Sequence, residues 1–208
     1  MLIGKYNKSL IISYLGVASA VLGMFFLASS NGNDIKIAII LYVVAGVCDM
    51  LDGMVARMCK RDKDEELFGI QLDSLADTID FVVFPIVLGL FLGFKEWYNV
   101  VSYVLIAMAG VQRLCHFNVL VINKKDKGPV KFYSGLPVTS TAITFPLCWL
   151  VCKLACASFD AMHIAFTILT YLTAILFVLN VKVPKPRGKA YPIMGIIAIL
   201  GIIAIILA

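Results

Sequence analysis

The sequence has few charged residues, which make up only 15% of its 208 positions. A typical soluble domain carries about 25% charged residues. Hydrophobic residues account for 61% of the chain, and several apolar runs reach the roughly 20 residues that a helix needs to cross a bilayer. This composition excludes an ordinary soluble globular domain and predicts a helical membrane protein.

The sequence also lacks a Gly/Ser-rich linker, a low-complexity tract and an obvious internal repeat. We therefore expect one membrane domain over residues 1–208, with no room for a separate soluble domain. The first apolar run, from about Leu10 to Ala28, follows Lys5 and Lys8 as in a secretory signal. It is longer than the apolar core of a signal and lacks a clear cleavage site, so we interpret it as a retained first span.

The apolar runs predict an all-α integral membrane fold, with a six-span helical bundle core and one additional C-terminal span. The last run is short and interrupted by glycine. The expected spans cover residues 9–30, 36–57, 70–92, 97–117, 136–156, 161–181 and 191–208.

The connections between these spans carry an uneven distribution of basic residues, which predicts the orientation. Cytoplasmic connections of membrane proteins are enriched in Lys and Arg. With the N-terminus in the cytoplasm, fourteen of the 18 basic residues fall on the cytoplasmic side: Lys5, Lys8, Arg57, Lys60, Arg61, Lys63, Lys124, Lys125, Lys127, Lys131, Lys182, Lys185, Arg187 and Lys189. A net charge of +5 then suits anionic lipid head groups and phosphates, and not nucleic acid.

Four aspartates fall within or at the ends of two neighbouring expected spans. Asp49 and Asp52 are three residues apart, and Asp73 and Asp77 are four apart, so each pair shares one helix face. A carboxylate in a membrane span is costly and indicates function by default. Because the two spans are antiparallel neighbours joined by a short connection, we expect all four side chains to meet near the cytoplasmic side.

Four converging carboxylates cannot all stay ionised without cations between them. Oxygen ligands suit Mg²⁺ or Mn²⁺, and two such ions can clamp a pyrophosphate. The alternative is a buried carboxylate paired with Arg57 or with a backbone amide, which would explain one aspartate more easily than four. Gly53 and Ala56 are small and leave room for a ligand beside the acids, and Arg57 can offer a forked donor to a phosphate.

Together these residues form the pattern Asp49-x-x-Asp52-Gly53-x-x-Ala56-Arg57, followed by Gly69-x-x-x-Asp73-x-x-x-Asp77. The pattern resembles the signature of the CDP-alcohol phosphotransferase family at all eight fixed positions. The gap between Arg57 and Gly69 is slightly longer than usual, and we place the extra residues in a charged loop, Lys60–Glu66. We expect Gly69 to open the third span.

The resemblance implies a CDP-linked lipid as donor and CMP as the leaving group. It implies that Asp49, Asp52 and Asp73 bind metal, with Asp77 as a further ligand and the general base. The resemblance also implies that the CDP-linked lipid is bound by Asp52, Gly53, Ala56, Arg57 and Gly69. Two Mg²⁺ or Mn²⁺ ions and a homodimer are also implied.

Three further segments resemble the branch of the family that makes phosphatidylserine. They are Asp73-Ser74-Leu75-Ala76-Asp77, Arg113-Leu114-Cys115-His116-Phe117-Asn118 and Phe132-Tyr133-Ser134-Gly135-Leu136-Pro137. The resemblance implies transfer of the phosphatidyl group from CDP-diacylglycerol to L-serine.

Arg113, Asn118 and Lys131 are candidates for the acceptor site. Alternatively, Arg113 extends to the interface and Lys131 is a basic anchor. The chain departs from the serine branch at Asp80 and Val82, where a small hydroxyl residue and a glycine are usual, and at Cys115-His116, where Ala-Arg is common.

Two alternative hypotheses for the function remain open. Glycerol 3-phosphate or an inositol phosphate could be the acceptor in the same reaction class. A small cation or proton transporter also uses acids within spans, but transporters favour midplane sites and inverted repeats, which are not evident here.

Overall fold

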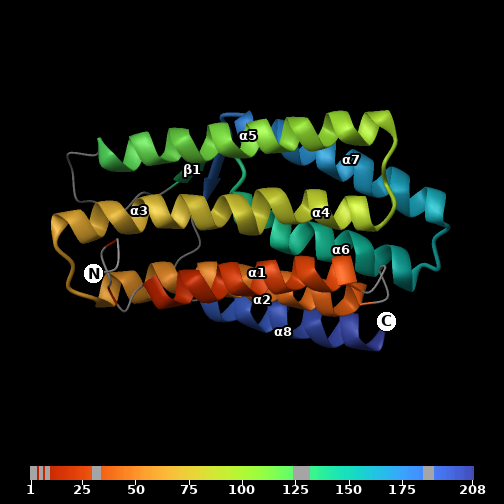
Figure 1. Ribbon diagram of the computed structural model, residues 1–208, viewed down its shortest axis with the longest axis horizontal. Coiled ribbons are helices and arrows are strands. Elements are labelled where there is room, and N and C mark those ends of the chain that lie inside the picture. The colour runs from red at the N-terminus through yellow and green to blue at the C-terminus, as the bar shows by residue number, and fades with distance from the viewer. Residues whose placement is uncertain (1–3, 5–6, 8–9, 30–33, 124–131, 185–189) are drawn as a thin grey trace.

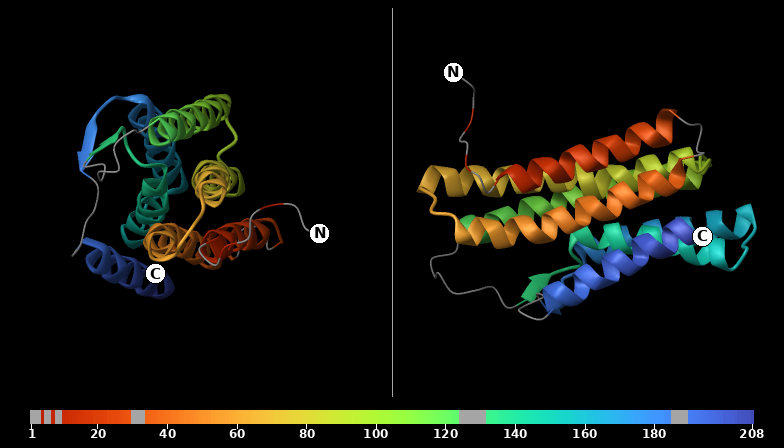
Figure 2. Two further views of the ribbon diagram at one scale, coloured as in Figure 1. Left: turned by 90° about the vertical axis from the view of Figure 1, so that its left-hand side faces the viewer. Right: turned by 90° about the horizontal axis from the view of Figure 1, so that it is seen from below.

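A computed structural model describes residues 4, 7, 10–29, 34–123, 132–184 and 190–208. In these residues the chain is mostly helical, and long helices run side by side along one axis of the molecule (Figure 1). Viewed along that axis, the helices form a bundle with the last helix on its outside (Figure 2).

The described elements follow one another as up-and-down helices with short connections. In chain order they are α1 (Leu10–Ser29), α2 (Ile35–Met58), α3 (Lys63–Asp77), the π-helical segment η1 (Thr78–Val83), α4 (Phe84–Phe91), α5 (Trp97–Ile122), β1 (Phe132–Ser134), the 3₁₀ turn η2 (Val138–Ser140), α6 (Thr141–Leu154), α7 (Phe159–Val178), β2 (Lys182–Pro184) and α8 (Ala190–Leu207).

Five of these helical stretches are long and apolar enough to cross a membrane: Leu10–Ser29, Ile35–Ala56, Lys63–Phe91, Trp97–Ile122 and Phe159–Val178. Two more, Val138–Leu154 and Pro192–Leu207, are apolar but shorter. The predicted all-α, multi-pass membrane class is therefore confirmed, while the count of six core spans stays a prediction.

The third helix begins earlier than the sequence analysis predicted. Asp62 caps its N-terminus: the side chain of Asp62 accepts a hydrogen bond from the backbone N–H of Glu65, and the side chain of Glu65 accepts one from the N–H of Asp62. Such reciprocal capping stabilises a first turn by about 1 kcal/mol. The expected charged loop over residues 60–66 is thus mostly helix. Gly69 lies inside the helix and does not open it, so both expectations were wrong.

The elements α3, η1 and α4 form one continuous rod, and its π-helical segment ends two residues before Pro85. Proline has no N–H to donate to the carbonyl four residues before it, which here belongs to Phe81. The hydroxyl of Thr141, at the start of α6, lies 2.9 Å from that carbonyl oxygen and 2.8 Å from the carbonyl oxygen of Val138, so the two carbonyls share its one proton. The irregular segment is therefore tied to a neighbouring helix.

The rod lies between the α1–α2 pair on one side and α5 on the other (Figures 1 and 2). Glycines allow both contacts. A Cβ added at Gly23 of α1 would lie 2.8 Å from Phe84, and one added at Gly110 of α5 would lie 2.6 Å from Val82. The ring of Phe84 also stacks on Tyr42 of α2, with centroids 4.1 Å apart. This close packing fixes the depth of the acidic residues that the rod carries.

A polar cluster joins α5 and α7 near the end of the bundle that is remote from the α2–α3 turn. Asn99 is fully buried and donates to Thr167 at 2.7 Å, and its oxygen lies 2.7 Å from Nε2 of His163. The imidazole stacks on Phe94 with centroids 4.5 Å apart. His163, for which the sequence offered no role, therefore has a structural one.

Two short strands depart from the purely helical prediction. Phe132–Ser134 pairs antiparallel with Lys182–Pro184, and the turn after β1 uses Gly135 with φ +78°. The N–H of Gly135 donates to Val181 at 2.8 Å. A Cβ at Gly135 would lie 2.9 Å from the carbonyl oxygen of Phe177, so glycine is required both by conformation and by space.

We predict that Thr141→Val destabilises the fold, because the carbonyls of Phe81 and Val138 then lose the hydroxyl that they share in an apolar interior. Leaving such a group unsatisfied costs about 1–3 kcal/mol. The measurement is the unfolding free energy in detergent micelles. Thr170→Val is the matched control, since that buried hydroxyl donates to the Phe166 carbonyl of its own helix. Equal losses in the two variants would contradict the proposed importance of the Thr141 bond.

Candidate metal and substrate site

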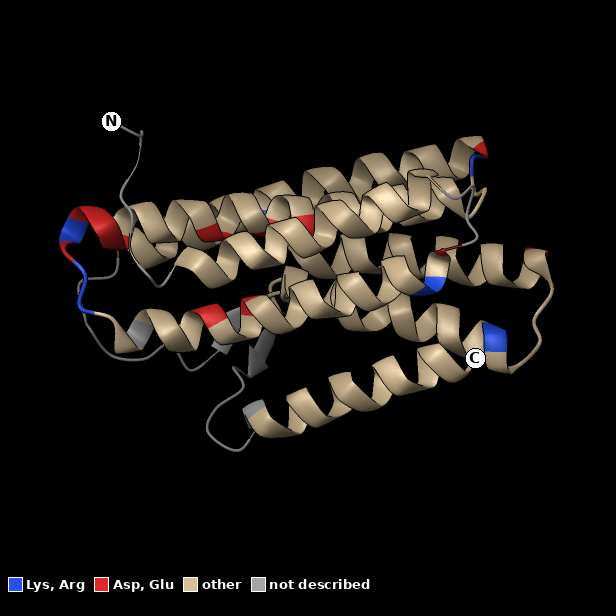
Figure 3. Ribbon diagram, turned by 60° about the horizontal axis from the view of Figure 1, so that its bottom comes forward, with Lys and Arg blue, Asp and Glu red and all other residues tan. Residues whose placement is uncertain are grey.

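The four aspartates singled out by their spacing, hereafter the signature aspartates, come together between α2 and α3. Carboxylate oxygens of Asp49, Asp52 and Asp73 lie within 4.8 Å of one another. The side chain of Asp77 lines one small cavity together with these three residues. The expected convergence of the side chains is therefore present, and acidic stretches are visible on helices of a bundle in which most residues are uncharged (Figure 3).

Like charges at such separations repel strongly. Two carboxylates about 4–5 Å apart repel by roughly 3–4 kcal/mol at an effective dielectric constant of about 20. Asp52 is also buried, with 7% of its surface exposed, and accepts a 2.7 Å hydrogen bond from the hydroxyl of Ser13 on α1. A compact set of carboxylate oxygens with one oriented by a neighbouring hydroxyl fits a hard divalent cation.

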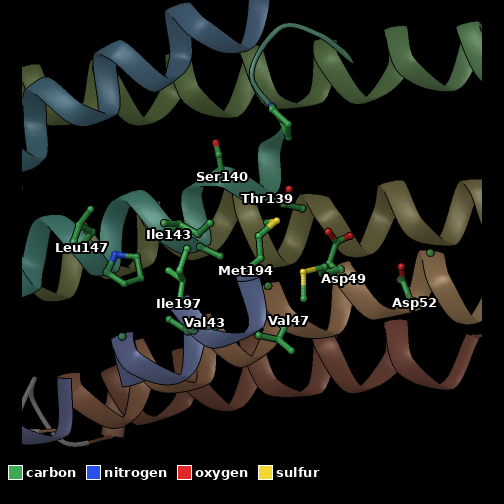
Figure 4. Close-up of a pocket in the computed structure, with 18 of the residues that line it drawn as sticks. Val43, Val47, Asp49, Asp52, Thr139, Ser140, Ile143, Leu147, Met194 and Ile197 are labelled. Carbon is green, nitrogen blue, oxygen red and sulfur yellow. The ribbon is translucent and has the colours of Figure 1, made fainter. Parts of the chain in front are cut away.

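A cavity of about 550 Å³ opens beside the cluster, between α2, α6 and α8. Asp49 and Asp52 lie at one end, and apolar side chains such as Val43, Ile143 and Ile197 line its length (Figure 4). Further lining comes from Gly53, Asp73, Phe117 and several residues of α6 and α8. One space thus offers charged groups at one end and an apolar wall along the rest.

The carboxylates separate this cavity from a second, much smaller one against α1. Asp49, Asp52 and Asp73 line both spaces. Asp77 and Asp80 line only the small cavity. Asp49, Asp52 and Asp73, hereafter the carboxylate partition, therefore lie between the large cavity and the small one, which Ser13 and Gly16 of α1 also line.

The small residues of the signature differ in what they do. Gly53 lines the large cavity, and a Cβ at this position would meet nothing within 4 Å, so the backbone of α2 is open to a ligand there. Ala56 is half-buried one turn further on. Gly69 lies one turn before Asp73, and a Cβ there would lie 3.1 Å from the guanidinium of Arg61. The side chain of Arg57 lies outside the described residues.

The predicted acceptor residues are not all gathered at the cavity. Arg113 is buried on α5 with 8% of its surface exposed. Asn118 accepts a 2.8 Å hydrogen bond from the hydroxyl of Ser74, which neighbours Asp73. Neither side chain lines the large cavity, although Phe117 beside Asn118 does. Lys131 lies outside the described residues.

Several residues at the site were not assigned to it from the sequence. Ser13 contacts Asp52, Thr139 and Ser140 line the large cavity near Asp49 (Figure 4), and Arg61 approaches Gly69. Serine and threonine are common in apolar runs, so their positions in the sequence give little indication of a functional site. Asp80 was recognisable as unusual in the sequence, because it stands where the serine branch of the family usually has a small hydroxyl residue.

Comparison with known proteins agrees with the signature. Residues 9–179 match the family model described as CDP-alcohol phosphatidyltransferase. The CDP-diacylglycerol–serine O-phosphatidyltransferase of Saccharomyces cerevisiae is 38% identical over 104 residues, which are 48% of this chain and 37% of that protein. The match therefore spans well under half of the yeast relative.

Two archaeal relatives match over more of their length. The archaetidylserine synthase of Methanothermobacter thermautotrophicus is 30% identical over 176 residues, 84% of this chain and 69% of that protein. The CDP-diacylglycerol–serine O-phosphatidyltransferase of Methanocaldococcus jannaschii is 27% identical over 182 residues, 87% of this chain and 77% of that protein. The family model matches most of this chain, and the structure brings the signature aspartates together. The chain therefore belongs to the CDP-alcohol phosphatidyltransferase family.

Proposed function

We propose that this protein transfers the phosphatidyl group of CDP-diacylglycerol to the hydroxyl of L-serine, forming phosphatidylserine and CMP. The observation that carries the proposal is the cluster of Asp49, Asp52 and Asp73 at one end of an apolar cavity. A donor with a charged pyrophosphate and apolar tails matches that arrangement. The names of the yeast and Methanocaldococcus relatives support serine as acceptor.

The family uses divalent metal, and the donor set here fits it. We assign Asp49, Asp52 and Asp73 as ligands, with Asp77 as a further ligand, and two Mg²⁺ or Mn²⁺ ions as the occupants. Bound metal supplies neutralisation of the pyrophosphate charge. The hydroxyl of Ser13 holds the Asp52 carboxylate in place by the 2.7 Å hydrogen bond, as outer-shell donors do at metal sites.

Asp77 is the proposed general base. The serine hydroxyl oxygen attacks the phosphorus on the lipid side, the bond from that phosphorus to the CMP oxygen breaks, and the hydroxyl proton passes to Asp77. Asp77 lines the small cavity and not the large one. A base in this place lies beside the metal-binding carboxylates and apart from the cavity assigned to the lipid.

The donor's two ends require different surroundings. An acyl chain fits the apolar length of the large cavity, against residues such as Val43, Leu147 and Ile197. The cytidine end would lie toward the α2–α3 turn, beside Gly53, Ala56, Arg57 and Gly69. The open space at Gly53 supports this placement, because the pyrophosphate can approach the backbone of α2 there.

The acceptor carboxylate needs a basic partner, for which we propose Arg113 and Lys131, with Asn118 as a neutral partner. Arg113 is buried on α5, the helix that reaches the site through Asn118 and Ser74. A buried guanidinium suits forked recognition of a carboxylate.

We further propose that the N-terminus and the active site face the cytoplasm, that residues 1–208 form one domain, and that the enzyme is a homodimer. The distribution of basic residues in the sequence supports the orientation. Soluble CMP and serine are then exchanged directly with the cytoplasm.

A phosphorylated acceptor is the same-class alternative. Glycerol 3-phosphate or an inositol phosphate would call for more than one basic residue at the acceptor site, and the named relatives do not favour it. A cation transporter is disfavoured by membership of the family.

The first prediction concerns the acceptor. Purified protein with CDP-diacylglycerol and Mg²⁺ or Mn²⁺ is expected to release CMP with serine, together with stoichiometric phosphatidylserine, and to stop when the metal is chelated. Glycerol 3-phosphate and inositol phosphate are assayed separately. Release only with a phosphorylated alcohol would overturn the serine assignment, and no release from folded protein would overturn the reaction.

The second prediction concerns Asp77. Asp77→Asn is expected to lower kcat by roughly 100- to 10,000-fold, because general bases contribute in this range, while metal-dependent binding of CDP-diacylglycerol is largely retained. Asp160→Asn, at an exposed position in the first turn of α7, is the matched control and is expected to leave turnover unchanged. Normal turnover in Asp77→Asn would exclude its role as base.

The third prediction concerns the cavity. Gly201→Leu on α8 places a side chain in the space assigned to an acyl chain and is expected to raise KM for CDP-diacylglycerol by roughly fivefold or more, as overfilled sites cost about 1–3 kcal/mol. Gly195→Leu is the control, because a Cβ meets nothing within 4 Å at either glycine, and Gly201 lines the cavity whereas Gly195 is not among its lining residues. Identical KM values for the two variants would place the lipid elsewhere.

A further inference from the structure

A fifth aspartate, Asp80, lies close to the signature aspartates and has no part in the function proposed above. It is located on η1, one turn beyond Asp77, and only 3% of its surface is exposed. Among the described residues its Oδ1 atom has no hydrogen-bond partner. Burying a carboxylate without a partner is expensive, so an arrangement that keeps one in this position calls for a ligand.

The side chain of Asp80, whose Oδ1 has no hydrogen-bond partner among the described residues, borders the small cavity against α1. Asp80 lines this space together with the signature aspartates, Ser13 and Gly16. The volume is about 10 Å³, which is comparable to the space taken by a single water molecule. A space of this size admits one ion and excludes a substrate.

Helix α1 is shaped to accommodate Asp80. A Cβ added at Gly16 would lie 3.2 Å from Oδ2 of Asp80 and 3.4 Å from Cβ of Cys48, which is tighter than ordinary contact. One turn earlier on the same helix, Ser13 holds Asp52. Asp52 and Asp80 therefore both face α1 and line the same small cavity.

The backbone also places Asp80 in a non-standard way. The π-helical segment Thr78–Val83 carries it, and such segments are frequent at functional sites. The hydrogen bond from Thr141 to the Phe81 carbonyl holds the next residue of the segment. The direction of Asp80 is thus set by tertiary structure and not by local flexibility.

We propose that Asp80 is an additional cation ligand, which binds one divalent ion in the small cavity on the α1 side of the carboxylate partition. The proposal rests on the metal use proposed above. It extends the ligand set of the signature by one carboxylate, which lies deeper in the bundle than the other four. The competing explanation is a carboxyl group that carries a proton permanently and binds no metal.

Direct counting of bound Mn²⁺ separates these explanations. Equilibrium binding of Mn²⁺ to the full chain in lipid nanodiscs, followed by electron paramagnetic resonance of the free ion, gives the number and affinity of sites. Asp80→Asn is expected to bind one ion fewer, or to bind one at least tenfold more weakly. Asp160→Asn, which removes an exposed acid elsewhere, is expected to match the unaltered protein.

Thermal unfolding with and without Mn²⁺ provides a second readout. Without metal, Asp80→Asn is expected to raise Tm, because it removes a buried repulsive charge, whereas the increase in Tm on adding Mn²⁺ is expected to shrink. A merely structural role would lower Tm equally in both conditions. If Asp80→Asn does not fold, Asp80→Ser, which restores the small hydroxyl usual in the family, takes its place.

The outcomes distinguish the two proposals. Unaltered Mn²⁺ stoichiometry and affinity in Asp80→Asn, with binding intact in the unaltered protein, would overturn the role of Asp80 alone. Absence of Mn²⁺ binding by the unaltered, folded protein would overturn the metal-dependent function on which it rests.

Discussion

The convergence of carboxylates between α2 and the α3–η1–α4 rod is the interaction on which the rest of the structure depends. Charges of one sign, packed within 4.8 Å inside an apolar bundle, separate the helices unless a cation or protons offset the repulsion. The bundle resists separation through close glycine contacts on both sides of the rod, at Gly23 and Gly110. Rigid packing and metal affinity are therefore linked, since the fold holds the ligands closer than they would stay by themselves.

The same packing explains how a membrane protein can handle a substrate that is both charged and apolar. The carboxylates lie at one end of the large cavity, and α8 supplies much of the apolar wall through Met194, Ile197 and Ile205. This helix lies beyond the range matched by the family model, which ends at residue 179. The carboxylate cluster thus lies in the range that the family model matches, whereas part of the apolar wall of the cavity is added by a helix beyond that range.

Local patterns predicted much of this arrangement, and tertiary contacts account for most of what they missed. Apolar length predicted the helices, and the spacing of Asp49, Asp52, Asp73 and Asp77 predicted their meeting. The early start of α3 was readable from Asp62 and Glu65, but the charges around them suggested a loop. The π-helical segment could not be predicted from Pro85 alone, since the surroundings of its Phe81 carbonyl include a hydroxyl that Thr141 brings from a distant part of the chain.

The partition formed by the carboxylates bears on the direction of the reaction. In an in-line displacement, the attacking and leaving oxygens lie on opposite sides of the phosphorus. Asp49, Asp52 and Asp73 line both cavities, whereas Asp77 lines only the small one. The small cavity, at about 10 Å³, excludes a serine molecule, so the proposed base can take a proton only from a hydroxyl that lies at the rim where the carboxylates meet both spaces. The position of a single aspartate thus limits where the proposed acceptor can bind.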